Sequence, residues 1–130
     1  MKNYSKLGEH GLVWIAIAGA GAAVDERRRD AFVRAGATVA GSFLANQAIK
    51  LVVRRPRPKL AGLPPVIDTM SDRSYPSAHA TTCGAAAVAI GDAWAWPVAI
   101  SMALTRPYLG VHYPSDSLAG FVLGMAVAEL

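Results

Sequence analysis

The chain has 130 residues, of which 53% are hydrophobic and 17% are charged, and its formal net charge is +4. This length predicts one domain over residues 1–130, and an apolar content above that of an average soluble domain indicates a membrane protein. The basic residues gather at a few places without interleaved aromatic residues, which argues against nucleic acid as a partner.

The first predicted helix covers the apolar run 12–24. Residues 1–10 lack the arrangement of a signal peptide, and we expect ordered structure from Gly11 onward. A hydrocarbon core of ~30 Å needs about 20 helical residues, so this helix must borrow from Leu7 to Gly11 or lie partly in the interface. A polar turn at 25–30 separates it from a second predicted helix, 31–53, which is long enough to span.

Two prolines in the segment 54–59 end the second helix, because proline removes an N–H donor and disfavours helical geometry in the residue before it. A long loop over residues 60–75 follows, and we expect it to shape a site. Further helices are predicted over 77–90, over 97–105, and from position 114 or 115 to the end of the chain. The pattern therefore predicts an all-α bundle of about five helices that is integral to a membrane.

A small-xxx-small pair, Gly120 and Gly124, lies in the last predicted helix. Glycine at this spacing lets two helices approach closely. We expect the partner to be another helix of the same chain rather than a second chain.

Polar residues interrupt the apolar pattern in three clusters, and helices that alternate across the layer would place all three on one face. The clusters are Lys50 with Arg57-Pro58, Pro76 to His79, and Arg106 with His112 and Asp116. Each cluster alone has an ordinary structural explanation: cations that snorkel from a helix end, a capped helix with an exposed histidine, or a surface His–Asp pair. Their expected convergence is what suggests chemistry.

The residue types in these clusters suit phosphoryl transfer. His112 and Asp116 are four apart, so a helix that begins near Pro114 lets the carboxylate fix the orientation and tautomer of the imidazole. Ser77 suits a helix N-cap, and the free N–H groups of a first turn bind anions. Three permanent cations can hold phosphoryl oxygens. One histidine can attack phosphorus while the other protonates the leaving oxygen.

In this order and spacing the clusters resemble the signature of the type 2 phosphatidic acid phosphatase superfamily, whose lipid phosphatases share their site with vanadium haloperoxidases. That signature is Lys, six residues, Arg-Pro; then Pro-Ser-Gly-His; then Ser-Arg, five residues, His, three residues, Asp. The matching segments here are Lys50 to Arg57-Pro58, Pro76-Ser77-Ala78-His79, and Thr105-Arg106 to His112 to Asp116. Every spacing is kept, while Ala78 stands where Gly is usual and Thr105 where Ser is usual.

The resemblance implies a lipid phosphatase with a haloperoxidase-like helical core that works through a phosphohistidine. It implies that His112 is the nucleophile, Asp116 the group that orients it, and His79 the general acid. The phosphoryl oxygens would be held by Lys50, Arg57, Ser77, Arg106 and the backbone N–H of Ala78. No metal and no cofactor are expected. Integral members commonly have six membrane helices, so the lower count here invites a homo-oligomer that completes the wall around the lipid tail.

The sequence leaves the lipid open: it could be a polyprenyl-phosphoryl phosphoribose, undecaprenyl diphosphate or a glycerophospholipid phosphate. Outside the site, more Lys and Arg residues fall on the catalytic face than opposite it, which leans toward a cytoplasmic site in a multi-pass protein of the cell membrane. The basic residues Arg54, Arg55, Arg57 and Lys59 support an alternative, a non-catalytic protein that binds anionic lipid headgroups. A vanadate-dependent oxidant enzyme is a third hypothesis.

Overall fold

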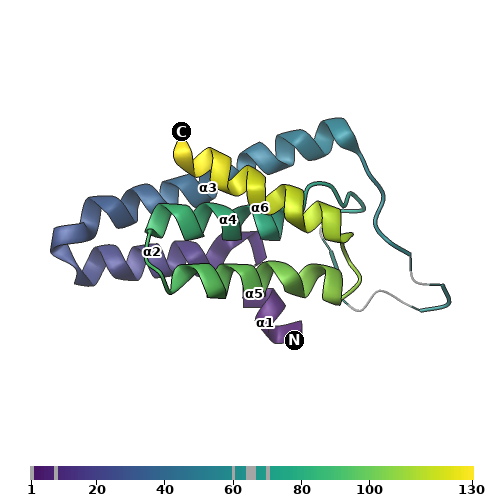
Figure 1. The fold of residues 1–130 in the computed structure, drawn as a ribbon, viewed down its shortest axis with the longest axis horizontal. Helices are drawn as coiled ribbons and strands as arrows, with labels where there is room; N and C mark the ends of the chain where they lie inside the picture. Colours follow the sequence, from purple (N-terminus) through teal and green to yellow (C-terminus); the bar gives the residue numbers. More distant parts are fainter. Residues whose placement is uncertain (1, 8, 60, 64–66, 70) are drawn as a thin grey trace.

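The computed structural model of the chain describes residues 2–7, 9–59, 61–63, 67–69 and 71–130. Its elements in chain order are α1 (Lys2–Leu7), the 3₁₀ helix η1 (Glu9–Gly11), α2 (Leu12–Val24), the 3₁₀ helix η2 (Glu26–Arg28), α3 (Arg29–Val53), α4 (Ala78–Ile90), α5 (Ala95–Tyr108) and α6 (Pro114–Glu129). The five longer helices, α2 to α6, pack lengthwise against one another (Figure 1). The expectation of an all-α fold with about five helices is confirmed for the described part of the chain.

Helix α4 forms the centre of the bundle and packs against α2, α3, α5 and α6. Every residue from 79 to 87 is buried, and most are Ala, Thr or Gly, whose short side chains let neighbouring backbones approach. A Cβ on Gly124 of α6 would overlap the carbonyl oxygen of Thr81, and one on Gly120 would overlap that of Ser77. The expectation that this glycine pair packs inside the chain is therefore confirmed.

The described residues before Gly11, namely 2–7 and 9–10, are helical, so the expectation that ordered structure starts at Gly11 is wrong. The Tyr4 hydroxyl lies 2.7 Å from the Ser101 hydroxyl and ties α1 to α5. The His10 ring meets the edge of the Phe43 ring, with 5.8 Å between ring centroids. Gly11 has φ 73, a left-handed geometry that glycine adopts at low cost and that redirects the chain. Helix α2 therefore begins at Leu12 and does not extend back into the preceding residues.

Two other helices differ from their predicted ranges. Helix α3 begins at Arg29, because the Asp25 side chain accepts a hydrogen bond from the Arg28 N–H and η2 leads straight into it. Helix α5 runs over 95–108 instead of 97–105, with Pro107 inside its last turn. Arg106 consequently projects from a helix and not from the following turn.

The predicted loop before α4 lies at one end of the bundle (Figure 1). Within it, residues 60, 64–66 and 70 lie outside the described part of the chain. Pro56 and Arg73 form an antiparallel bridge, and the Ser74 N–H donates to the Arg55 carbonyl at 2.7 Å. These contacts hold the two limbs of the loop together, so that the segment around Arg57 is fixed beside the helix ends.

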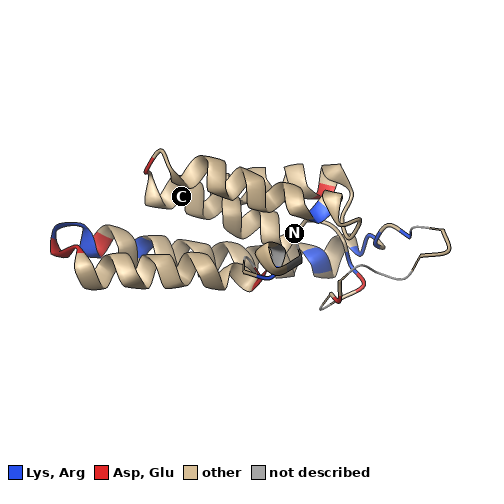
Figure 2. Ribbon diagram, turned by 90° about the horizontal axis from the view of Figure 1, so that it is seen from below, with Lys and Arg blue, Asp and Glu red and all other residues tan. Residues whose placement is uncertain are grey.

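Charged residues gather at the two ends of the bundle, and the middle is almost free of them (Figure 2). At the end away from the loop, Arg28 of η2 forms a 3.0 Å ion pair with Asp92, which follows α4. Among the helices described, none combines the length and the apolar character needed to cross a membrane.

Candidate active site

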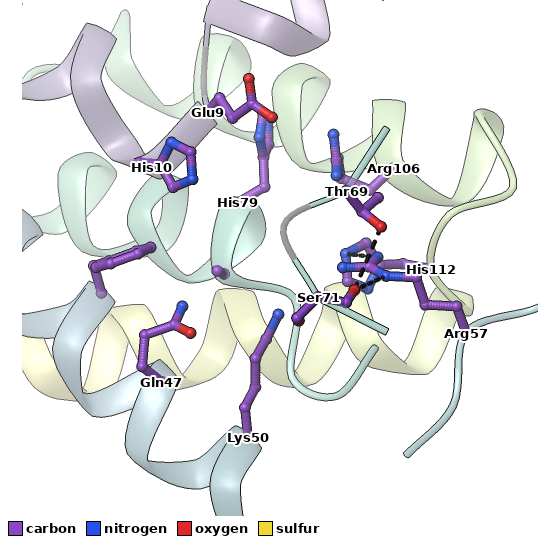
Figure 3. Close-up of a pocket in the computed structure, with 12 residues that line it drawn as sticks. Glu9, His10, Gln47, Lys50, Arg57, Thr69, Ser71, His79, Arg106 and His112 are labelled. Carbon is purple, nitrogen blue, oxygen red and sulfur yellow. Dashed lines mark hydrogen bonds between the residues drawn. The ribbon is translucent and has the colours of Figure 1, made fainter. Parts of the chain in front are cut away.

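A cavity of about 160 Å³ lies at the loop end of the bundle, where the three polar clusters meet. The predicted site residues that line it are Lys50, Arg57, Ala78, His79, Arg106 and His112. At about 30 Å³ of liquid volume per water molecule, the cavity holds roughly five waters and so has room for a phosphoryl group. Figure 3 shows His112 beside Arg57 at one end of the cavity and His79 at the other.

His112 lies in the turn between α5 and α6, and its Nε2 atom is 3.0 Å from Nη1 of Arg57. A guanidinium can only donate, so Nε2 accepts this bond and we assign the ring proton to Nδ1. Nδ1 faces Oδ2 of Asp116 at 3.7 Å, which is longer than a hydrogen bond. The lone pair of Nε2 therefore accepts from Arg57 in this structure, and Arg57 must turn to a bound phosphoryl oxygen before Nε2 can attack phosphorus.

The surroundings of His112 keep its imidazole neutral. Burial, followed by the positive charges of Arg57, Arg106 and Lys50, lowers the pKa of His112 to about 2. A neutral imidazole has the free electron pair that attack on phosphorus requires.

Asp116 is fully buried behind the cavity wall and is held from two sides. Its Oδ1 atom accepts a hydrogen bond of 2.9 Å from Nη1 of Arg55, and its Oδ2 atom accepts one of 2.9 Å from the Tyr113 N–H. The Arg55 guanidinium also lies over the Tyr113 ring, 4.2 Å from its centroid. Sequence reasoning missed Arg55. The signal was chemical, because a buried carboxylate beside a neutral imidazole needs another cation.

Two cations of the cavity, Arg57 and Lys50, are held by backbone carbonyls. Arg57 donates from Nε to the Ser71 carbonyl at 2.7 Å and from Nη1 to the Val111 carbonyl at 2.8 Å. The Lys50 ammonium lies 3.4 Å from the Arg73 carbonyl. Positive groups held in this way need little rearrangement to receive an anion, which is the preorganisation that phosphoryl transfer exploits.

The N-terminus of α4 also faces the cavity, through Ala78. The first N–H groups of a helix have no partner within it and carry partial positive charge. Ser77 occupies the N-cap position that the sequence predicted, because its hydroxyl accepts from the Ala80 N–H at 3.4 Å. Ser77 is fully buried and does not line the cavity. It supports the anion site by starting the helix there.

His79 lies at the end of the cavity away from His112 and is buried. Its Nε2 atom has no hydrogen-bond partner within the described residues. A buried imidazole nitrogen with spare hydrogen-bonding capacity can serve the oxygen of a leaving group.

Four further residues line this end of the cavity and were missed by sequence reasoning: Glu9, His10, Phe43 and Gln47. Phe43 and Gln47 precede Lys50 by seven and three positions on α3. Residues at these spacings share a helix face, so the signal was present in the sequence. Glu9 and His10 had no comparable signal, because they come from the N-terminal segment.

Comparisons with known proteins give one consistent result. A family model described as the PAP2 superfamily matches residues 31–130. The decaprenylphosphoryl-5-phosphoribose phosphatase of Mycobacterium tuberculosis (strain CDC 1551 / Oshkosh) is 41% identical over 136 residues, which cover 99% of this chain and 75% of that protein. The undecaprenyl-diphosphatase BcrC of Bacillus subtilis (strain 168) is 34% identical over 105 residues, which cover 74% and 53%.

A solved structure is also similar over nearly the whole chain. It is the crystal structure of the first transmembrane PAP2 type phosphatidylglycerolphosphate phosphatase from Bacillus subtilis. The two folds superpose with a TM-score of 0.80 at 26% sequence identity, over 99% of this chain and 71% of the other.

Proposed function

The chain belongs to the PAP2 superfamily, and from that membership we propose that it removes the terminal phosphate of a polyprenyl-linked lipid through a phosphohistidine on His112. It is a lipid phosphatase, like the relatives that cover nearly all of it. The observation that carries the proposed mechanism is the Nε2 atom of His112, held 3.0 Å from Arg57 in a cavity that Lys50 and Arg106 also line.

In the first step, Nε2 of His112 attacks phosphorus and the bond from phosphorus to the bridging oxygen breaks. The electron pair of that bond goes to the bridging oxygen, which takes a proton from His79; in this proposal the negative phosphoryl group bound beside His79 favours its imidazolium form. Lys50, Arg57, Arg106 and the N-terminus of α4 hold the charge on the phosphoryl oxygens. The products are the free leaving group and the phosphohistidine, whose Nδ1–H is oriented by Asp116.

In the second step, water attacks phosphorus from the side that the leaving group has left. Neutral His79 takes a proton from this water, and the bond from phosphorus to Nε2 breaks with its electron pair returning to the imidazole of His112. Inorganic phosphate is released and both histidines regain their starting forms. Apart from the attacking water, the groups named in these two steps are side chains and backbone N–H groups of the chain.

The site lies at a membrane surface in this proposal, and residues 1–130 form one membrane-embedded domain. Supporting this, charged residues gather at the two ends of the bundle (Figure 2), and Leu44, Leu104 and Leu118 of its helices are exposed. Helix α3, with 25 residues at about 1.5 Å each, is long enough for a hydrocarbon core of ~30 Å. The distribution of basic residues favours a cytoplasmic site in a multi-pass protein. A homo-oligomer would complete the wall around the lipid tail.

The proposal is tested by phosphate release from a panel of lipid phosphates. The panel contains a polyprenylphosphoryl 5-phosphoribose, undecaprenyl diphosphate and a phosphatidylglycerol phosphate, offered to detergent-purified protein. Wild-type protein is expected to release phosphate in the presence of EDTA, and His112→Ala is expected to release none. Phosphate release by His112→Ala at the wild-type rate would reject the phosphohistidine mechanism.

A non-catalytic role in binding anionic headgroups is less well supported. Of its four basic residues, Arg54 and Lys59 are exposed, but Arg55 and Arg57 turn inward to Asp116 and His112. Vesicle binding without turnover, retained after loss of both site histidines, would favour this alternative.

A further inference from the structure

The end of the cavity away from His112 is polar. Glu9, His10 and Gln47 line it together with the ring of Phe43. Figure 3 shows Glu9 and His10 beside His79, whereas Arg57 lies with His112 at the opposite end. These side chains come from two elements far apart in sequence, η1 and α3, and none belongs to the three clusters that carry the phosphatase signature.

The geometry of in-line displacement determines which part of the substrate lies at the His79 end of the cavity. The leaving oxygen departs opposite the attacking Nε2 of His112, and so toward His79. The group attached to that oxygen is therefore placed among Glu9, His10 and Gln47, while the phosphoryl oxygens stay with the cations.

The side chains at this end of the cavity favour a leaving group that carries hydroxyl groups. The Glu9 carboxylate only accepts hydrogen bonds, and the Gln47 amide both donates and accepts. Glu9 interacts electrostatically with Arg106, and His10 with His79. A leaving alcohol with neighbouring hydroxyl groups can donate to the carboxylate and bond to the amide. A leaving group that is itself a phosphate brings negative charge against Glu9.

The backbone conformation of η1 shows that the surrounding structure fixes the position of this turn. His10 adopts φ 56 and ψ 13, a left-handed conformation that is uncommon for residues other than glycine and that surrounding structure must enforce. Its ring is held edge-on by Phe43, and a Cβ on the following Gly11 would lie 2.9 Å from side-chain atoms of Thr82 and Val39. The turn is thus pressed onto α3 and α4 and carries Glu9 to the cavity.

We propose that Glu9, His10 and Gln47 form a leaving-group subsite that selects a hydroxyl-bearing alcohol, such as a sugar, over a lipid phosphate. The subsite rests on the proposed function, because it presupposes attack by His112 and departure toward His79. The subsite predicts a higher kcat/KM for a sugar 5-phosphate than for a polyprenyl diphosphate. The N-terminal segment is then part of the specificity of the enzyme.

The test compares two substrates with the same prenyl chain, farnesylphosphoryl 5-phosphoribose and farnesyl diphosphate. Glu9→Gln removes the negative charge with little change of shape. The ratio of kcat/KM for the sugar phosphate to kcat/KM for the diphosphate is expected to fall about tenfold or more. Glu26→Gln makes the same change in the exposed 3₁₀ helix at the other end of the bundle, and its ratio is expected to match that of wild type.

A second variant tests the subsite from another element. Gln47→Leu, in α3, is expected to lower kcat/KM for the sugar phosphate and to spare the diphosphate, whose continued turnover shows that the variant is folded. Equal effects on both substrates in Glu9→Gln and Gln47→Leu would overturn the subsite and leave the phosphatase mechanism standing. A wild-type protein that hydrolyses neither substrate would overturn the proposed function and the subsite with it.

Discussion

Arg55 donates a hydrogen bond of 2.9 Å to one oxygen of Asp116, while the other oxygen of the same carboxylate faces Nδ1 of His112 at 3.7 Å. The carboxylate is fully buried, so its position depends on these partners and on the Tyr113 N–H. Arg55 touches neither the cavity nor His112 in the described contacts and acts through Asp116. We therefore regard it as a positioning residue.

Replacing Arg55 should slow the chemical step more than it weakens substrate binding. Arg55→Gln is expected to lower kcat about 10- to 100-fold, by analogy with the loss of a residue that orients a metal ligand, with KM changed little. Arg55→Lys should recover part of the loss, because it keeps the charge but not the planar fork. Steady-state kinetics on farnesyl phosphate measure both quantities.

Arg54→Gln is the matched control for that change. Arg54 is the exposed neighbour whose Nε bonds to the Leu51 carbonyl at the end of α3. Its kcat is expected to stay within twofold of wild type. Equal losses in the two variants would mean that general positive charge, and not the contact with Asp116, supports catalysis.

Variants of the two histidines should differ in how their loss of activity depends on the leaving group. His79→Ala is expected to lose about 10²–10⁴-fold on an alkyl phosphate, the usual contribution of a general acid. The loss should be much smaller on p-nitrophenyl phosphate, whose leaving group departs without a proton. His112→Ala should lose activity on both substrates, and rapid quenching with ³²P-labelled substrate should trap no phosphoenzyme from it. A loss in His79→Ala that does not depend on the leaving group would contradict its role.

Acidification should destabilise the protein through His112. Burial and neighbouring cations lower its pKa to about 2 in the fold, whereas a histidine in an unfolded chain titrates near pH ~6.5. Between these values the unfolded state binds the extra proton. The free energy of unfolding therefore rises with pH in this window and falls as pH decreases, by at most about 1.4 kcal/mol per unit for one proton.

The measurement is the unfolding temperature in detergent between pH 7 and pH 5, for wild type and His112→Gln. The wild-type value is expected to fall more steeply on acidification, because the variant has removed one group that gains a proton on unfolding. Parallel slopes would show that His112 is not held neutral in the fold.

The close contact of α6 with α4 should tolerate no added methyl group. Gly124→Ala places a Cβ against the Thr81 carbonyl and is expected to destabilise the protein by about 1–3 kcal/mol. Gly41→Ala in α3 meets no atom within 4 Å and is expected to stabilise by about 0.5–1 kcal/mol through helix propensity. Thermal unfolding of the two variants in the same detergent shows whether Gly124→Ala lowers the stability of the protein and Gly41→Ala raises it. A Gly124→Ala protein as stable as Gly41→Ala would contradict the packing.

The sequence by itself determined most of the helices and the set of reactive groups. An apolar run predicted α2 over residues 12–24, as observed, and α6 begins at Pro114, one of its two predicted starting positions. The spacing of His112 and Asp116 predicted that the carboxylate would face the imidazole once a helix began at Pro114, and the structure has that arrangement. These features follow from local geometry, because helix periodicity fixes which nearby side chains share a face.

Only the tertiary structure decided which distant groups meet. The link from Arg55 to Asp116 and the place of Glu9 beside the cavity depend on how a loop and the N-terminal turn pack on the ends of the helices. No periodicity along the chain encodes these contacts, since they join segments separated by tens of residues whose approach is set by close packing around small side chains. The reacting groups could therefore be predicted from the sequence, while their positioning and the wall that faces the leaving group required the fold.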